Sequence, residues 1–80
     1  MSSWKHIGTC VDGQRFSIAG LNVWDHEWLR RAGESADITD PQYGQPCTFP
    51  VYDIADGERS ITFAAGEFSN CVWGFYTRAS

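Results

Sequence analysis

The sequence predicts an α+β protein that is mostly antiparallel β, with five to six strands curled into a small barrel or half-barrel and one short helix at about 25–32. Two Asp-Gly pairs, each between segments of alternating apolar residues, are typical of hairpin turns. The 80 residues are 42% hydrophobic and include four Trp, five Phe and three Tyr. A large aromatic side chain buries about 150–250 Å², so these residues can supply a core. We expect one small globular domain over residues 1–80.

The first Asp-Gly pair, Asp12-Gly13, predicts a hairpin near the N-terminus. A two-residue loop would pair Val11 with Gln14 and bring the strand before the turn against the strand after it. Because side chains alternate between faces, the apolar residues expected together on the core face are Ile7, Val11, Phe16 and Ile18.

The second pair, Asp56-Gly57, predicts a hairpin in the second half of the chain. The same loop length pairs Tyr52 with Ile61 and Ile54 with Arg59. The expected core face consists of Tyr52, Ile54, Ile61, Phe63 and Ala65.

Between these hairpins, the stretch LNVWDHEWLRRAGES has the end signals of a two-turn helix. Asp25 suits the N-cap, Arg30 and Arg31 suit the last turn, and Gly33 suits the left-handed position after the end. A helix this short needs tertiary packing, so Trp24, Trp28 or Leu29 should dock on the sheet. The alternative is an irregular strand through 27–32.

The remaining strands are expected to form an edge and a meander. Residues 36–39 form a possible short edge strand, and prolines limit pairing at the start of the strand near 47–54. The stretch FAAGEFSNCVWGFY, residues 63–76, predicts a last hairpin with Ser69 and Asn70 at its tip. Gly66 then faces Trp73, so that a large ring lies over a glycine; alternatively, Gly66 is a bulge.

Charge and cysteine content exclude several classes of protein. The net charge is −4 and the acids are scattered, whereas a nucleic-acid binder needs a basic face. We see no secretory signal or membrane span. Three cysteines without metal-ligand spacing favour a reducing, cytoplasmic setting and predict no metal site and no cofactor.

The function expected from these features is that of a small intracellular binding or interaction module with a protein partner, of an inhibitor-like or immunity-like kind. Partly exposed Trp and Tyr are frequent anchors of such interfaces. The candidate ligand-binding residues are Glu67, Ser69, Asn70, Trp73, Tyr76, Trp28 and Tyr43. We expect a monomer or a homodimer formed through an edge strand.

Two other functions stay open. A carbohydrate-binding module would use exposed, coplanar Trp or Tyr rings. A small enzyme or enzyme subunit would need a pocket in which Glu67, a histidine and a cysteine converge. No nucleophile motif or glycine-rich phosphate loop occurs in the chain, so catalysis is the less expected of these functions.

Overall fold

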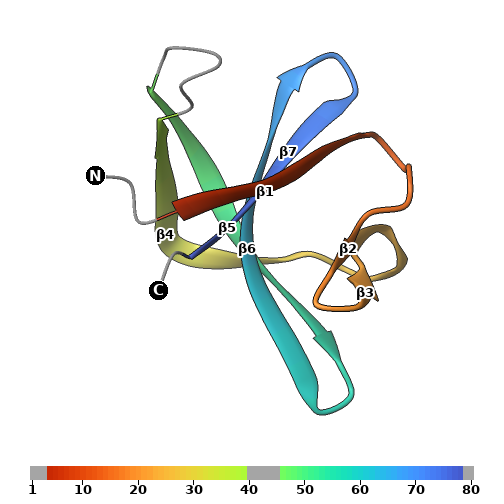
Figure 1. Cartoon of the computed structure of the whole chain (residues 1–80). Helices are drawn as coiled ribbons and strands as arrows, with labels where there is room; N and C mark the ends of the chain where they lie inside the picture. The colour runs from red at the N-terminus through yellow and green to blue at the C-terminus, as the bar shows by residue number, and fades with distance from the viewer. Residues whose placement is uncertain (1–3, 40–45, 79–80) are drawn as a thin grey trace.

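The computed structural model of the chain describes residues 4–39 and 46–78 and confirms a mostly antiparallel β protein (Figure 1). Five strands form one sheet in the order β1-β7-β6-β5-β4, and β2 and β3 form a separate two-stranded ladder. The elements are β1 (Trp4–Val11), β2 (Ser17–Ile18), β3 (Leu21–Asn22), the 3₁₀ turn η1 (Val23–Asp25), β4 (Leu29–Thr39), β5 (Pro46–Asp56), β6 (Arg59–Ser69) and β7 (Val72–Arg78).

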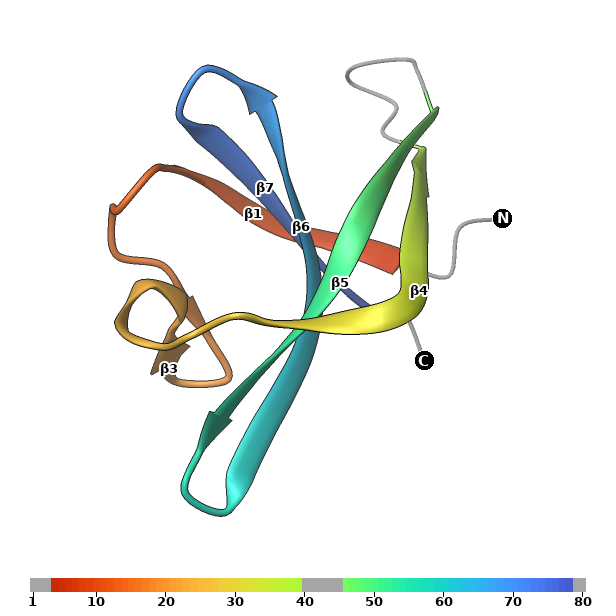
Figure 2. The same ribbon diagram turned by 180° about the vertical axis from the view of Figure 1, so that it is seen from behind.

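The main sheet is curled, yet it does not close into the predicted barrel. Strands β4 to β7 follow one another as a meander, and β1 returns to pair with β7. Both ribbon views show the strands crossing at large angles and β4 bending sharply towards β1 (Figures 1 and 2). These two edge strands come close, but no ladder joins them in the described part of the chain.

Both faces of the central strands are covered, which explains the small residues in β6. Phe63 and Ala65 belong to one core and Ala64 to the other, as the alternation of side chains along a strand requires. The first core consists of Cys10, Ile18, Leu21, Val23, Ile54, Phe63, Ala65 and Phe75. The second consists of Ala36, Ile38, Phe49, Val51, Ala64 and Tyr76.

The prediction of a helix at about 25–32 is wrong. A 3₁₀ turn over Val23–Asp25 is capped by Asn22, whose side-chain oxygen accepts hydrogen bonds from the amides of Phe16 (3.1 Å) and Trp24 (3.4 Å). The chain then enters β4 at Leu29, in agreement with the alternative strand. A two-turn helix gains few internal hydrogen bonds for its nucleation cost, whereas as a strand Leu29 and Arg30 pair with Asp53 and Tyr52 of β5.

The hairpin predicted at Asp12-Gly13 is also wrong, although its turn forms. The Gln14 amide donates to the Val11 carbonyl (2.9 Å), and Gly13 has a φ of 80°. The chain then leaves the strand, and β1 pairs with β7 instead. On β1 the expected faces are therefore reversed, because Val11 is 52% exposed and Cys10 only 8%, whereas Ile18 and Phe16 pack in or against the first core as expected. Pairing with β7 turns Cys10 towards the first core.

The hairpin of β5 and β6 forms with a different register. Tyr52 pairs with Phe63 and Ile54 with Ile61, around a turn at residues 57–58. Moving the turn by one residue moves each partner by two, which keeps every side chain on its predicted face. The expected core face is accordingly found packed in or against the first core.

The last hairpin also turns one residue later than predicted, but most of its ladder is displaced by one residue instead of two, so Gly66 no longer faces Trp73. Its tip is at residues 70–71, Gly66 pairs with Gly74, and Glu67 pairs with Trp73. The register shifts between Glu67 and Ser69, so the irregularity lies near the tip and Gly66 is not a bulge.

The edges of the sheet lie where the sequence indicated. Residues 36–39 belong to the edge strand β4, which is longer than expected. The start of β5 pairs only with β4, and pairing with β6 begins at Val51. Within the described ranges, no helix is long and apolar enough to cross a membrane.

Candidate binding surface

Trp24 and Trp28 meet Trp73, from a distant part of the chain, above the first core. The ring centroids of Trp24 and Trp28 lie 5.1 Å apart, and those of Trp28 and Trp73 lie 5.5 Å apart. Tyr52 continues the group at 5.3 Å from Trp28. We call the side chains of Trp24, Trp28, Tyr52 and Trp73 the tryptophan surface. All four are partly exposed and pack against the buried residues of the first core.

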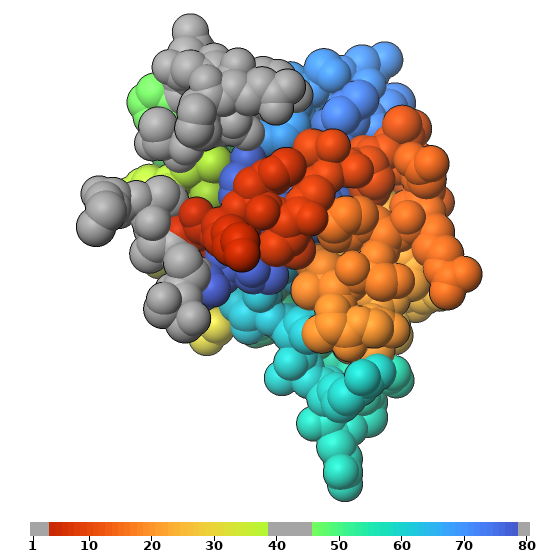
Figure 3. Space-filling model, in the orientation of Figure 1, coloured from red at the N-terminus to blue at the C-terminus, as the bar shows by residue number. Residues whose placement is uncertain are grey.

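The segment between β1 and β4 brings two of these tryptophans to the sheet. It lies to one side of the central strands, between β1 and the projecting β5–β6 hairpin, and the space-filling view shows its atoms filling that space (Figures 1 and 3). Asn22 caps the 3₁₀ turn that carries Trp24. The indole N–H of Trp28 donates to the Val23 carbonyl (2.7 Å). Trp73 and Tyr52 come from β7 and β5.

The polar ends of two indoles are turned away from solvent. The Nε1 atom of Trp24 is buried and makes no hydrogen bond within the described residues, while that of Trp28 is occupied by Val23. A tryptophan usually directs its N–H to a partner or to water. Trp24 and Trp28 therefore offer ring carbon to solvent. A buried N–H without a hydrogen bond costs about 1–3 kcal/mol.

Trp73 and Tyr52 stand at steep angles to their neighbours in this surface, whereas Trp24 and Trp28 are inclined by 35° to each other. Trp73 is inclined by 76° to Trp24 and by 85° to Trp28, and Trp28 is inclined by 57° to Tyr52. Edge-to-face contacts of this kind are favourable between aromatic rings. Such angles give an uneven apolar surface and differ from the coplanar rings that the carbohydrate hypothesis requires.

Cys10 lies beneath these rings, and its environment keeps the thiol protonated. Burial raises the pKa of Cys10, the nearby indole N–H of Trp24 lowers it, and the negative charge of Asp12 raises it again, with a net increase. Since the thiolate is the nucleophilic form, Cys10 behaves as a small apolar core residue.

The structure brings together two of the residues predicted as ligand-binding, Trp28 and Trp73. Tyr76 is only 2% exposed and belongs to the second core, on the opposite face of β7 from Trp73. Tyr43 lies outside the described residues. Sequence reasoning missed Trp24 and Tyr52 as members of the surface. The four-residue separation of Trp24 and Trp28 is a signal that could have indicated a shared surface.

The predicted residues at the hairpin tip close the turn. Ser69 and Asn70 are exposed, and a carboxylate oxygen of Glu67 accepts a hydrogen bond from the Cys71 amide (3.3 Å). Cys71 itself has a φ of 64°, an unfavourable region for a residue with a side chain. Glu67 also lies directly across from Trp73 in the ladder, so it borders the tryptophan surface.

Of the groups named for an enzymatic pocket, Glu67 and Cys71 lie side by side at the last hairpin, whereas His6 and Cys10 lie on opposite faces of β1. The ring of His6 contacts that of Tyr76 of the second core at a tilt of 55° (centroids 5.1 Å), whereas Cys10 belongs to the first core. In residues 4–39 and 46–78, no group of three or more His, Cys, Asp or Glu side chains is arranged to hold a metal ion.

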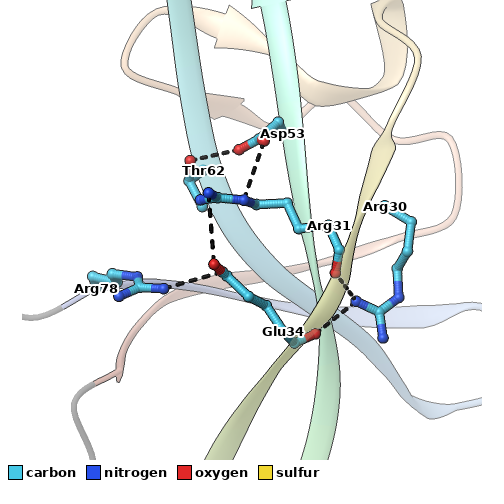
Figure 4. A network of polar contacts seen from close by, with 6 residues as sticks. All are labelled: Arg30, Arg31, Glu34, Asp53, Thr62 and Arg78. Atoms are coloured by element: carbon cyan, nitrogen blue, oxygen red, sulfur yellow. Dashed lines mark hydrogen bonds and ion pairs between the residues drawn. The ribbon is translucent and has the colours of Figure 1, made fainter.

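The opposite face of the sheet carries a polar network instead (Figure 4). Arg31 contacts Asp53 (3.4 Å) and Glu34 (3.6 Å), and Glu34 also contacts Arg78 (3.1 Å). Arg30 donates to the carbonyls of Arg31 (2.8 Å) and Glu34 (2.7 Å). These contacts join β4, β5 and β7 where β4 bends, so we assign them a structural role.

Comparison of the chain with protein-family models, with curated proteins and with solved structures finds no significant match.

Proposed function

We propose that this protein is a small protein-binding module and that the tryptophan surface is its binding site. The observation that carries the proposal is the orientation of Trp24 and Trp28, whose polar N–H groups are directed into the fold while their rings stay partly exposed. Apolar aromatic surface of this kind is what the buried centre of a protein interface contains.

The shape of the surface favours a protein over a sugar. Rings inclined by 76° and 85° form ridges and hollows that side chains of a partner can fill. A pyranose ring stacks on a flat aromatic face, and the inclined rings offer less of such a face. Protein binding therefore makes better use of this geometry, and the same geometry supports the expectation of an interaction module.

The test compares two tryptophans on opposite faces of the molecule. Trp73 belongs to the tryptophan surface, whereas Trp4 packs on the second core and carries Arg78 over its ring (5.2 Å to the centroid). The immobilised full chain, Trp73→Ala and Trp4→Ala are each mixed with cell extract, and retained proteins are identified by mass spectrometry. We expect proteins that wild type and Trp4→Ala retain and Trp73→Ala loses.

Retention of the same proteins by all three would contradict the assignment of the surface. Retention of none over a wide range of salt would contradict the function. Thermal unfolding of both variants shows whether they are folded at the assay temperature. If Trp73→Ala is unfolded, Trp73→Phe replaces it, since a smaller ring keeps much of the core contact while changing the exposed shape.

A further inference from the structure

The charges of this protein are distributed unevenly between the polar network and the rest of the described chain. Three of the six basic residues, Arg30, Arg31 and Arg78, belong to the polar network around Glu34 and Asp53 (Figure 4). The other described residues carry seven acidic side chains and three basic ones. The net charge of −4 is therefore concentrated away from the network.

Two acids border the tryptophan surface: Glu67 on β6 and Asp12 in the turn that follows β1. Glu67 lies directly across from Trp73, and directly opposed side chains on one face have Cβ atoms about 4.5–5.5 Å apart. On the other side of Trp73, its ladder partner is Cys10. Asp12 follows two residues later, and its amide donates to the Cys71 carbonyl (2.7 Å).

Two further acids come from the segment that carries the other tryptophans. Asp25 follows Trp24 and Glu27 precedes Trp28 in the sequence, and both acids are exposed. Over residues 12–28 the only arginine or lysine is Arg15. Arg59 is directed towards the Ala19 carbonyl (3.5 Å). The tryptophan surface is thus apolar at its centre and acidic at its margin.

This combination has a specific ligand chemistry. Arginine and lysine cations are attracted to indole faces, by about 0.5–2 kcal/mol per contact, and carboxylates around the rings add charge-assisted hydrogen bonds. A phosphate-rich or acidic ligand would meet repulsion at the same margin. Charge complementarity therefore selects one kind of partner.

We infer that the partner of the tryptophan surface is a positively charged protein segment, which places arginine or lysine side chains over the indoles and against the surrounding carboxylates. The inference rests on the proposed function and adds the chemistry of the partner. Arginine fits best, because its planar guanidinium stacks on a ring while its N–H groups reach a carboxylate.

The experiment uses random peptides displayed on phage and selected on the immobilised full chain. We expect enriched sequences with arginine or lysine beside apolar residues. A selected peptide is then synthesised and its binding is measured by tryptophan fluorescence against the wild type and two charge variants. Asp25→Asn/Glu27→Gln removes two acids at the margin. Asp56→Asn/Glu58→Gln removes two acids at the far end of the β5–β6 hairpin and is the matched control.

The expected result is a roughly three- to tenfold weaker affinity for the margin variant, as two partly exposed ion pairs would give, and a smaller change for the control. Enrichment of neutral or acidic peptides would overturn the inference while leaving the proposed function in place. Equal weakening by both variants would show that only net charge matters, and would also overturn it. Failure to enrich any peptide would contradict both proposals.

Discussion

The ring of Phe68 on β6 covers the backbone of Gly74 on the neighbouring strand β7, so closely that a Cβ atom at position 74 would overlap the ring. Phe49 covers Gly66 in the same way from β5. Both rings pack in or against the second core. The glycines of the last hairpin thus make room for rings on one face while the tryptophan surface occupies the other.

Gly74→Ala should therefore destabilise the protein, by about 1–3 kcal/mol, because the methyl group overpacks a buried site. Urea unfolding of the full chain measures this free energy. The matched control places the same change in a Phe68→Leu background, where the ring is absent. We expect the cost of Gly74→Ala to be smaller there; an unchanged cost would mean that backbone conformation, rather than the ring, requires glycine.

Gly33 lies within β4 and has a φ of 79°, and it serves the irregularity of this strand between Arg30 and Ser35. We expect Gly33→Ala to cost about 1–2 kcal/mol, since a Cβ is disfavoured in this conformation, although nothing within 4 Å would touch it. Gly33→Asn should cost less, because asparagine tolerates the left-handed region. Equal costs for both, measured by chemical denaturation, would contradict this explanation.

The two indole N–H groups predict different responses to replacement by phenylalanine. Trp28→Phe leaves the Val23 carbonyl without its donor and should cost about 2 kcal/mol or more. Trp24→Phe removes a buried N–H that has no hydrogen bond in the described chain. Removing this unsatisfied group is favourable, so it offsets part of the stability lost with the larger ring. We expect thermal unfolding to show the larger decrease for Trp28→Phe; the reverse order would contradict the assigned orientations.

The raised pKa of Cys10 predicts how stability changes with pH. In the unfolded chain the thiol loses its proton near its ordinary pKa of 9.0, while the folded protein retains it. The unfolded state then binds fewer protons, so the free energy of unfolding falls as the pH rises above that value, until the folded thiol also titrates.

Cys10→Ala should remove this component of the decline, so the stability difference between wild type and variant should shrink between about pH 8 and pH 10. Urea unfolding at several pH values measures the difference, and comparison with the variant cancels the titration of lysines and tyrosines elsewhere. A difference that does not change with pH would contradict the burial of a neutral thiol.

The ion pairs of the polar network should contribute little to the free energy of unfolding at ordinary salt concentration. Its side chains are partly exposed, with relative exposures of 35% for Glu34 and 60% for Arg78, and such ion pairs contribute about 0–1 kcal/mol. We expect Glu34→Gln to cost no more than this in urea unfolding, and less in high salt. Arg30→Ala should cost more, because the Arg30 guanidinium donates hydrogen bonds to the carbonyls of Arg31 and Glu34 at the bend of β4.

How much of the fold the sequence determined can be seen in the hairpins. The alternation of apolar residues predicted the correct core face of β5 and β6 even though the turn was displaced, because a shift of two residues preserves alternation. The turn chemistry of Asp12-Gly13 was equally correct locally. It gave the wrong partner strand, since a turn determines where the chain bends and not which strand β1 meets.

The candidate site shows the same limit more clearly. Alternation placed Tyr52 on the core face, and aromatic content indicated that some tryptophans would stay partly exposed. The meeting of Trp24, Trp28 and Trp73 was not predictable, because it depends on a sheet order in which β1 pairs with β7 and on a 3₁₀ turn in place of a helix.

The sequence alone thus determined composition, charge and the alternation of faces, which are local properties of neighbouring residues. Only the tertiary structure decided which strand pairs with β1, which secondary structure residues 25–32 adopt and on which face of the sheet each tryptophan lies. These depend on contacts between residues far apart in the chain, where the packing of rings against glycines such as Gly8 and Gly74 outweighs local propensity.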